Sequence, residues 1–152
     1  MTDADAMATL HEAARGLGLP LGRRALLLVQ SQARGESGYG SATFKGCVTR
    51  QPKNNWGSIH GEPGVACTDT NERGEPYVVT FRDFESPLAG ASALLGLLWR
   101  RPSVRRVLLD DSLDVDAFAG ALRRREPWGY YEAPEAVYAA MLRRNLRAIR
   151  GA

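Results

Sequence analysis

Hydrophobic residues recur at helical spacing in the first quarter of the chain. Residues 3–17 carry apolar side chains on one side and are followed by glycines and a proline, which predicts a first helix that ends there. Residues 22–35 predict a second helix, and its segment 25–29 is apolar on every face. A helix that is apolar all round is usually buried. We therefore expect the second helix to lie inside the core.

The middle third of the chain shows no helical period. Residues 38–64 are rich in Gly, Asn, Pro, Ser and Thr, which is typical of a loop with short strands at most. Two β-prone runs follow, at 65–68 and 77–81, and they flank the polar segment 69–76. This pattern predicts a small β-hairpin.

Helical periodicity returns after the hairpin. Ser86 is a good N-cap with Pro87 at the first helical position, and this helix is expected to reach about residue 100. Further helices are expected after Pro102, near Asp114 and from Pro134. The pattern predicts a mainly α (α+β) chain, with residues 1–152 forming one domain without repeats or linkers.

The composition is that of a globular protein, and the chain carries a small positive net charge. Of the 152 residues, 44% are hydrophobic and 24% charged, which is ordinary for a soluble domain. The net charge is +3 and the sequence pI about 9.1. That balance suits an anionic polymer such as a bacterial wall. It argues against a nucleic-acid partner, because the late arginines are expected on solvent faces, where nearby carboxylates nearly balance them.

The N-terminal residues do not look like a secretion signal. Residues 1–5 are acidic where a signal is basic, and no apolar stretch follows. The longest apolar run is too short to cross a bilayer, so no membrane insertion is expected. We expect synthesis in the cytoplasm. A substrate in the periplasm or outside the cell would then require delivery by lysis, injection or another non-standard route.

The two cysteines, Cys47 and Cys67, both lie in the loop-rich middle third, twenty residues apart. A bridge between them would contribute on the order of 3 kcal/mol in the chain-entropy model. The missing signal favours two free thiols instead, so both states stay open. Two cysteines with two distant histidines do not make a zinc site, and no metal or cofactor is expected.

Glu36 is the first candidate for chemistry. It stands where the apolar helix gives way to Gly38 and Gly40, which supply the backbone freedom that ends a helix. The carbonyl end of a helix and partial burial both disfavour a carboxylate. Both raise the pKa, as a general acid near neutral pH requires. The alternative interpretation is a surface glutamate in a loop.

Residues 54–61 form a second unusual stretch, Asn-Asn-Trp-Gly-Ser-Ile-His-Gly. It combines amide groups, an aromatic ring and a flexible backbone, which are the parts that sugar sites use. The alternative is a structural loop with Trp56 in the core.

Four short motifs together resemble glycoside hydrolase family 73. They are residues 36–40 (Glu-Ser-Gly-Tyr-Gly), 54–61 as above, 81–86 (Phe-Arg-Asp-Phe-Glu-Ser) and 128–134 (Trp-Gly-Tyr-Tyr-Glu-Ala-Pro), in the order and spacing of that family. The family consists of bacterial endo-β-N-acetylglucosaminidases of the lysozyme-like superfamily. The resemblance covers about residues 22–150. It implies a lysozyme-like helical domain with a hairpin beside the cleft, and peptidoglycan glycan strands as substrate.

The resemblance also implies roles for individual residues. Glu36 matches the catalytic glutamate, and Tyr130 matches the tyrosine of a Gly-Tyr motif near the active site. The cleft would be flanked by Asn54, Asn55 and Ile59, with Trp56 and His60 at less uniform positions. Tyr39 and Tyr130 would orient sugar or hydrogen-bond Glu36, or would serve packing. Residues 57–58 and 128–132 depart from the family pattern.

A second carboxylate is harder to assign. Glycosidases usually place two carboxyls about 5–5.5 Å apart for retention or about 6.5–9.5 Å apart for inversion. The candidates are Asp69 and Glu72 in the hairpin, then Glu62. Each also fits an ordinary turn acid. The acetamido group of the substrate could instead stabilise the oxocarbenium ion, so a single-acid mechanism is open.

Three other functions remain open at this stage. A muramidase or a lytic transglycosylase would act on the same glycan with the same Glu36. A non-catalytic lysozyme-like module would hold peptidoglycan without cleaving it.

Overall fold

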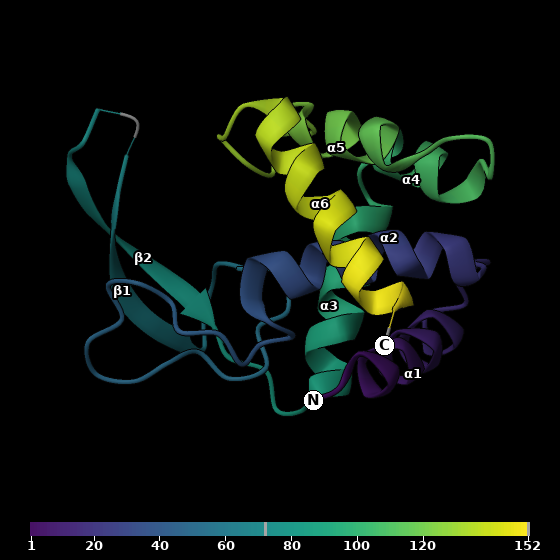
Figure 1. The fold of residues 1–152 in the computed structure, drawn as a ribbon. Coiled ribbons are helices and arrows are strands. Elements are labelled where there is room, and N and C mark those ends of the chain that lie inside the picture. Colours follow the sequence, from purple (N-terminus) through teal and green to yellow (C-terminus); the bar gives the residue numbers. More distant parts are fainter. Residues whose placement is uncertain (72, 152) are drawn as a thin grey trace.

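The computed structural model of the chain describes residues 1–71 and 73–151. These residues form six helices and one two-stranded antiparallel sheet, which confirms a mainly α fold with a hairpin (Figure 1). The elements are α1 (Asp3–Gly16), α2 (Arg23–Ser37), β1 (Gly64–Thr70), β2 (Pro76–Arg82), α3 (Pro87–Trp99), α4 (Pro102–Leu109), α5 (Val115–Arg123) and α6 (Glu135–Arg150). None of the described helices is long and apolar enough to cross a membrane.

Helix α2 runs through the middle of the helical body, as its apolar sequence predicts. It packs against α1 on one side and α6 on another, and α1 in turn packs against α3. Leu26 and Val29 of α2 are completely buried, as are Leu95 of α3 and Leu142 of α6. Each fully buried side chain of this size contributes about 1.5–3 kcal/mol relative to leaving it exposed. The carboxyl end of α2 leaves this core and points toward the hairpin (Figure 1).

The ends of the helices follow local side-chain chemistry. Ser86 Oγ accepts a hydrogen bond from Ala89 N at 3.1 Å, and Pro87 occupies the first turn, as expected. Helix α2 ends at Gly38, which adopts the left-handed conformation with φ 52° and ψ 42°. The helix therefore extends two residues beyond the predicted end at 35, because a glycine such as Gly38 adopts that conformation at low energy.

The hairpin forms a second, smaller core. Val65 pairs with Phe81 and Cys67 with Val79, and these four side chains are buried together. The loop before the hairpin contributes Phe44, whose ring lies 4.7 Å from that of Phe81. This cluster is separate from the core of the helical body, so the hairpin lobe relies on few apolar contacts.

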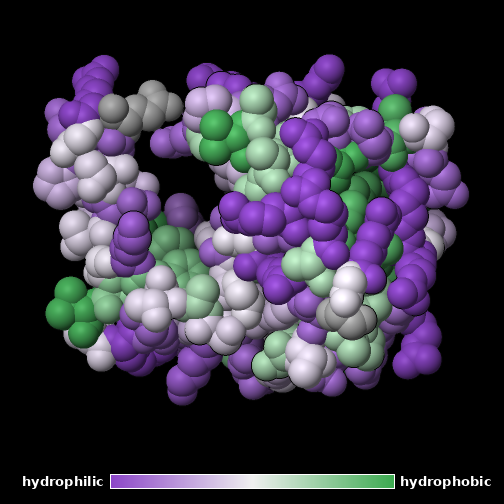
Figure 2. Space-filling model, in the orientation of Figure 1, coloured by the Kyte–Doolittle hydropathy of each residue, from purple (hydrophilic) through white to green (hydrophobic). Residues whose placement is uncertain are grey.

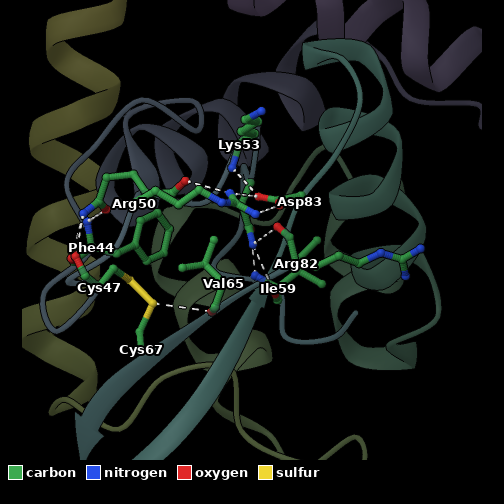
Figure 3. The surroundings of a disulfide bond; sticks show 11 residues. Phe44, Cys47, Arg50, Lys53, Ile59, Val65, Cys67, Arg82 and Asp83 are labelled. Atoms are coloured by element: carbon green, nitrogen blue, oxygen red, sulfur yellow. Dashed lines mark hydrogen bonds and ion pairs between the residues drawn. A yellow bond between two sulfur atoms is a disulfide. The ribbon is translucent and has the colours of Figure 1, made fainter. Parts of the chain in front are cut away.

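A disulfide between Cys47 and Cys67 joins the loop to strand β1 (Figure 3). The open question of the two cysteines is therefore answered in favour of a bridge. Further along the loop, Arg50 forms an ion pair with Asp83, which also accepts a hydrogen bond from Lys53 N at 2.8 Å. These links hold residues 38–63 against the hairpin, although that segment contains no helix or strand element of its own.

Candidate active site

Glu36 lies in the last turn of α2, inside the helix rather than beyond its end. Its side chain is partly buried between α2 and α6, two helices that pack together. From α6, the Tyr138 hydroxyl donates a hydrogen bond to Glu36 Oε1 at 2.6 Å. One carboxyl oxygen of Glu36 is thereby bonded to a helix from the other end of the chain.

Burial raises the pKa of Glu36 above its ordinary value. The hydroxyls of Tyr138 and Ser58 oppose this, because a hydrogen bond to the ionised carboxylate stabilises it. The balance leaves the pKa of Glu36 raised. A carboxyl that keeps its proton to a higher pH than usual, with two hydroxyls that stabilise the anion, is suited to act as a general acid.

The ring of Tyr138 is fixed by its neighbour Tyr131. The two rings stack at 3.7 Å with an interplanar angle of 1°, and the Tyr131 hydroxyl donates to Ala119 O at 2.9 Å. Burial, and then the negative charge of Glu36, raise the pKa of Tyr138, so it remains a proton donor. In the sequence, Tyr138 belongs only to the apolar stripe of the last helix. One feature of the sequence could have indicated a polar partner for Tyr138. A tyrosine on the apolar face of a helix is expected to be buried, and a buried tyrosine hydroxyl usually has a hydrogen-bond partner.

Tyr130 ties two loops together beside Glu36. Its hydroxyl donates to Gly57 O at 2.5 Å, which joins the segment before α6 to the 54–61 loop. Burial raises the pKa of Tyr130, and the charge of Glu36 raises it further. The Tyr130 hydroxyl is therefore bonded to the backbone of the 54–61 loop.

Buried Arg101 holds the segment that carries Tyr130. Its guanidinium donates to Leu122 O, Arg124 O and Trp128 O at 2.9, 2.7 and 2.9 Å, and lies 5.9 Å from the Tyr130 ring. From the sequence, Arg101 was expected on a solvent-exposed helix face together with the other late arginines. That expectation is wrong, because Arg101 is buried. No local pattern marks it, because its three carbonyl partners come from residues more than twenty positions away.

The two asparagines of the 54–61 loop shape the loop itself. Asn55 is fully buried: its amide donates to Ile59 O and Arg82 O at 2.8 and 2.9 Å and accepts from Ile59 N at 2.7 Å. Asn54 is partly buried and donates to Phe84 O at 3.0 Å, with a positive φ of 51°. The Asn55 amide has backbone partners at both its nitrogen and its oxygen, so it positions the loop, whereas Asn54 makes one such bond and stays partly exposed.

Trp56 and Tyr39 are placed in the core. Trp56 is completely buried, and its ring lies 5.4 Å from that of Tyr39. The Tyr39 hydroxyl donates to Asp3 Oδ1 at 2.6 Å, so it is directed away from Glu36. Of the two interpretations offered by the sequence, the structure supports packing for both residues, because neither ring can present a face to a ligand.

The remaining predicted residues lie on or beside the hairpin lobe. Ile59 is partly buried, and His60 is exposed with its ring 5.2 Å from Phe81. Burial lowers the pKa of His60, while the charge of Asp69 opposes that shift. Asp69 is exposed and accepts from the Tyr77 hydroxyl at 3.3 Å, and Glu62 is exposed as well. Glu72 lies outside the described residues.

No carboxylate among residues 1–71 and 73–151 contributes to the pKa shift of Glu36. The same residues contain no group of three or more His, Cys, Asp or Glu side chains that could hold a metal ion.

The molecule is hollowed between the hairpin and the helical body (Figure 2). On the hairpin side of the molecule, a cavity of about 290 Å³ lies between the hairpin and the loop before α6. It is lined by Asn71, Arg73, Glu75 and Glu132. A larger hollow of about 660 Å³ lies against α1, and the described lining residues of both cavities include none of the predicted site residues. We assign the substrate cleft to the hairpin side, because the carboxyl end of α2 with Glu36 points there.

Comparisons with known proteins address the fold. No protein-family model matches the chain, and no curated protein matches it in sequence. A mutant of a peptidoglycan hydrolase from Sphingomonas sp. A1 matches in structure with a TM-score of 0.66 and 27% identity, covering 98% of this chain and 95% of the other. The chain has the fold of a glycoside hydrolase domain.

Two further structures agree. A C-terminally truncated glycoside hydrolase domain of FlgJ from Salmonella typhimurium matches with a TM-score of 0.60 and 22% identity, over 98% of this chain and 95% of the other. A further structure of the Sphingomonas sp. A1 peptidoglycan hydrolase matches with a TM-score of 0.64 and 24% identity, over 99% and 92%. The lysozyme-like hydrolase fold expected from the four motifs is thereby confirmed.

Proposed function

We propose that the chain cleaves β-1,4-glycosidic bonds in the glycan strands of bacterial peptidoglycan, with Glu36 as the general acid. The observation that carries this proposal is the partly buried Glu36, whose pKa is raised and whose Oε1 accepts from Tyr138 at the end of α2 that points toward the hollow. The similar structures are peptidoglycan hydrolases or glycoside hydrolase domains by name, which supports the same substrate.

The proposed reaction follows from this geometry. Glu36 gives its proton to the glycosidic oxygen, and the bond from that oxygen to C1 breaks as positive charge develops on the sugar ring. Tyr138 and Ser58 stabilise the carboxylate that remains. Water then adds to C1, and its proton returns to Glu36. The substrate's acetamido group or a hairpin carboxylate, Asp69 or Glu72, would stabilise the positive charge.

The resemblance favours cleavage after N-acetylglucosamine, so reducing N-acetylglucosamine ends are the expected product. A muramidase would release reducing muramic ends, and a lytic transglycosylase would release anhydro ends. Mass spectrometry of the soluble products from purified peptidoglycan separates these three activities in one measurement.

The variant that tests the acid is Glu36→Gln, which keeps the shape of the side chain but has no proton to give. Its matched control is Glu12→Gln, at an exposed position on α1. We expect normal folding for both, product release by the control, and a loss of at least about 100-fold in Glu36→Gln. Equal activity of wild type and Glu36→Gln would contradict the proposal. Binding to insoluble wall without products from any of the three proteins would favour the non-catalytic module.

The second carboxylate is tested separately, with Asp69→Asn and Glu72→Gln beside Glu85→Gln as the control, because Glu85 is exposed, follows the hairpin and lines neither cavity. A loss of about 100-fold or more in one of the first two would identify the second group. Near-normal activity in both would favour assistance by the substrate's acetamido group.

A further inference from the structure

In the described part of the chain, the residues other than glycine that have a positive φ all lie in two segments of the candidate site. Tyr39 has φ 60° and follows Glu36 by three residues. Asn54 and Ser58 have φ of 51° and 52° and belong to the 54–61 loop. A side chain in this left-handed region strains the backbone, and such strain persists only where the surrounding structure enforces it. The contacts that enforce the conformation of Tyr39 are therefore part of how the site is held.

The side chain of Tyr39 is held on two sides. Its hydroxyl donates to Asp3 Oδ1 at 2.6 Å, and its ring lies 5.4 Å from that of Trp56. Asp3 is fixed in turn by two residues of α2, since its Oδ2 lies 3.3 Å from Arg34 Nη1 and its backbone O accepts from Gln30 Nε2 at 2.6 Å. The first turn of α1 thus anchors a tyrosine that lies 36 positions further along the chain.

The turn after α2 contacts the 54–61 loop directly. A Cβ added to Gly40 would lie 2.8 Å from Asn54 Cα, so the two backbones are already in contact. Gly40 N also donates to Ser37 Oγ at 3.1 Å, in the last turn of α2. Because Tyr39 directly precedes Gly40 in this turn, holding Tyr39 in place fixes the distance between the end of α2 and the loop.

We propose that Asp3 is a positioning residue for the active site: by anchoring Tyr39, it holds the 54–61 loop at a fixed distance from Glu36. This inference deepens the proposed function, and its catalytic consequence rests on that function. The family resemblance covers about residues 22–150, so it assigns no role to Asp3. Asp3 acts on the acid only through Tyr39 and the loop.

The position of the loop matters to the acid through two neighbouring residues. Gly57 O accepts from the Tyr130 hydroxyl at 2.5 Å, and the Ser58 hydroxyl is one of the two that stabilise the Glu36 anion. A loop released from its anchor would move both groups. Small displacements around reacting atoms slow the chemical step, because the productive geometry is populated less often. We therefore expect kcat to fall while KM stays nearly unchanged.

Four variants separate this role from a general effect on α1. Tyr39→Phe removes the hydroxyl and keeps the ring that packs on Trp56. Asp3→Ala removes both carboxyl oxygens, whereas Asp3→Asn keeps an oxygen that can accept from Tyr39. Asp5→Ala is the matched control, because the Asp5 side chain accepts from Thr2 N at 3.1 Å and caps the same end of α1 without bonding Tyr39.

The readouts are kcat and KM on soluble peptidoglycan fragments, the melting temperature, and the amide NMR signals of residues 54–61 without substrate. For Asp3→Ala and Tyr39→Phe we expect shifted loop signals and a fall of about tenfold in kcat. Asp3→Asn should keep most of the activity that Asp3→Ala loses. Combining Asp3→Ala with Tyr39→Phe should slow cleavage no further than Asp3→Ala alone, because both changes break the same contact. Asp5→Ala should lower the melting temperature and leave kcat and the loop signals unchanged.

Three results would overturn the proposal. They are a wild-type kcat in Asp3→Ala, an equal loss of kcat in Asp5→Ala, and losses from Asp3→Ala and Tyr39→Phe that add in the double variant. The NMR signals need no substrate. Loop signals that shift in Asp3→Ala but not in Asp5→Ala, in a chain whose wild type releases no sugar, would support the positioning role and contradict the proposed function instead.

Discussion

The Tyr138 hydroxyl and Glu36 Oε1 are joined by a hydrogen bond of 2.6 Å, although the two residues are 102 positions apart in the sequence. The bond connects α2 to α6. It makes the properties of the acid depend on a helix at the opposite end of the chain.

Tyr138→Phe removes this donor while keeping the ring that stacks on Tyr131. We expect the pKa of Glu36 to rise, because the carboxylate loses a hydrogen bond, and the basic limb of the pH–activity profile to move to higher pH. Cleavage should fall by about tenfold to 100-fold, the equivalent of one charged hydrogen bond. Tyr131→Phe is the control, since its hydroxyl bonds Ala119 O instead. Identical pH profiles for Tyr138→Phe and wild type would refute the role of the hydroxyl.

Glu36 should also make stability depend on pH. Burial raises its pKa in the folded chain above the ordinary 4.5, so the folded chain holds this proton more tightly than the unfolded chain. The contribution of Glu36 to stability is therefore complete below pH 4.5 and is lost as the pH rises through the folded pKa. The Glu36→Gln variant carries a neutral amide at this position at every pH, so it lacks this dependence.

Melting temperatures of wild type and Glu36→Gln between about pH 4 and 9 test this. We expect the two proteins to agree at the acid end and the variant to be the more stable above the folded pKa, by about 1.4 kcal/mol for each unit by which the pKa is raised. A difference that stays constant with pH would show that the carboxyl is not perturbed in the folded chain.

The disulfide is expected to stabilise the hairpin lobe in particular. Replacing both Cys47 and Cys67 by Ala should lower the free energy of unfolding by about 2–4 kcal/mol. In the described part of the chain, the core of this lobe contains four buried residues, whereas α2 and α6 belong to the larger core. Amide exchange should therefore accelerate in β1 and β2 and change little in α2 and α6. Uniform acceleration across all elements would mean that the two lobes unfold as one unit.

Gly57 is expected to tolerate no side chain. A Cβ there would lie 2.5 Å from the Tyr130 hydroxyl and 2.6 Å from Leu94 Cδ1, so Gly57→Ala must displace the tyrosine that bonds Gly57 O. We expect a loss of about 1–3 kcal/mol in stability together with weaker cleavage. Gly96→Ala in α3 is the matched control, because its Cβ meets only Arg100 Nη1, at 3.6 Å. It should be neutral or stabilising, since alanine favours a helix. Equal behaviour of the two variants would contradict the packing around Gly57.

Local patterns were sufficient for most of the fold. The periodicity of residues 3–17, the cap at Ser86 and Pro87, and the two β-prone runs each depend on neighbours in sequence, and the structure confirms the elements they predict. Glu36 could be singled out for the same reason: an apolar helix ending in glycines places it at the end of a buried segment. The end of α2 differed by two residues, because the helix continues until Gly38 adopts the left-handed conformation.

The sequence by itself determined the elements, the placing of Glu36 at the end of a buried helix, and the motifs of a glycoside hydrolase. Tertiary structure alone decided that Tyr138 bonds Glu36, that Asn55 and Trp56 are buried, and that Cys47 and Cys67 are joined. The physical reason is the distance along the chain over which each interaction acts. Helix and turn preferences act over a few residues, whereas a buried hydroxyl, amide or arginine takes its partner from whichever distant segment the packed core brings beside it.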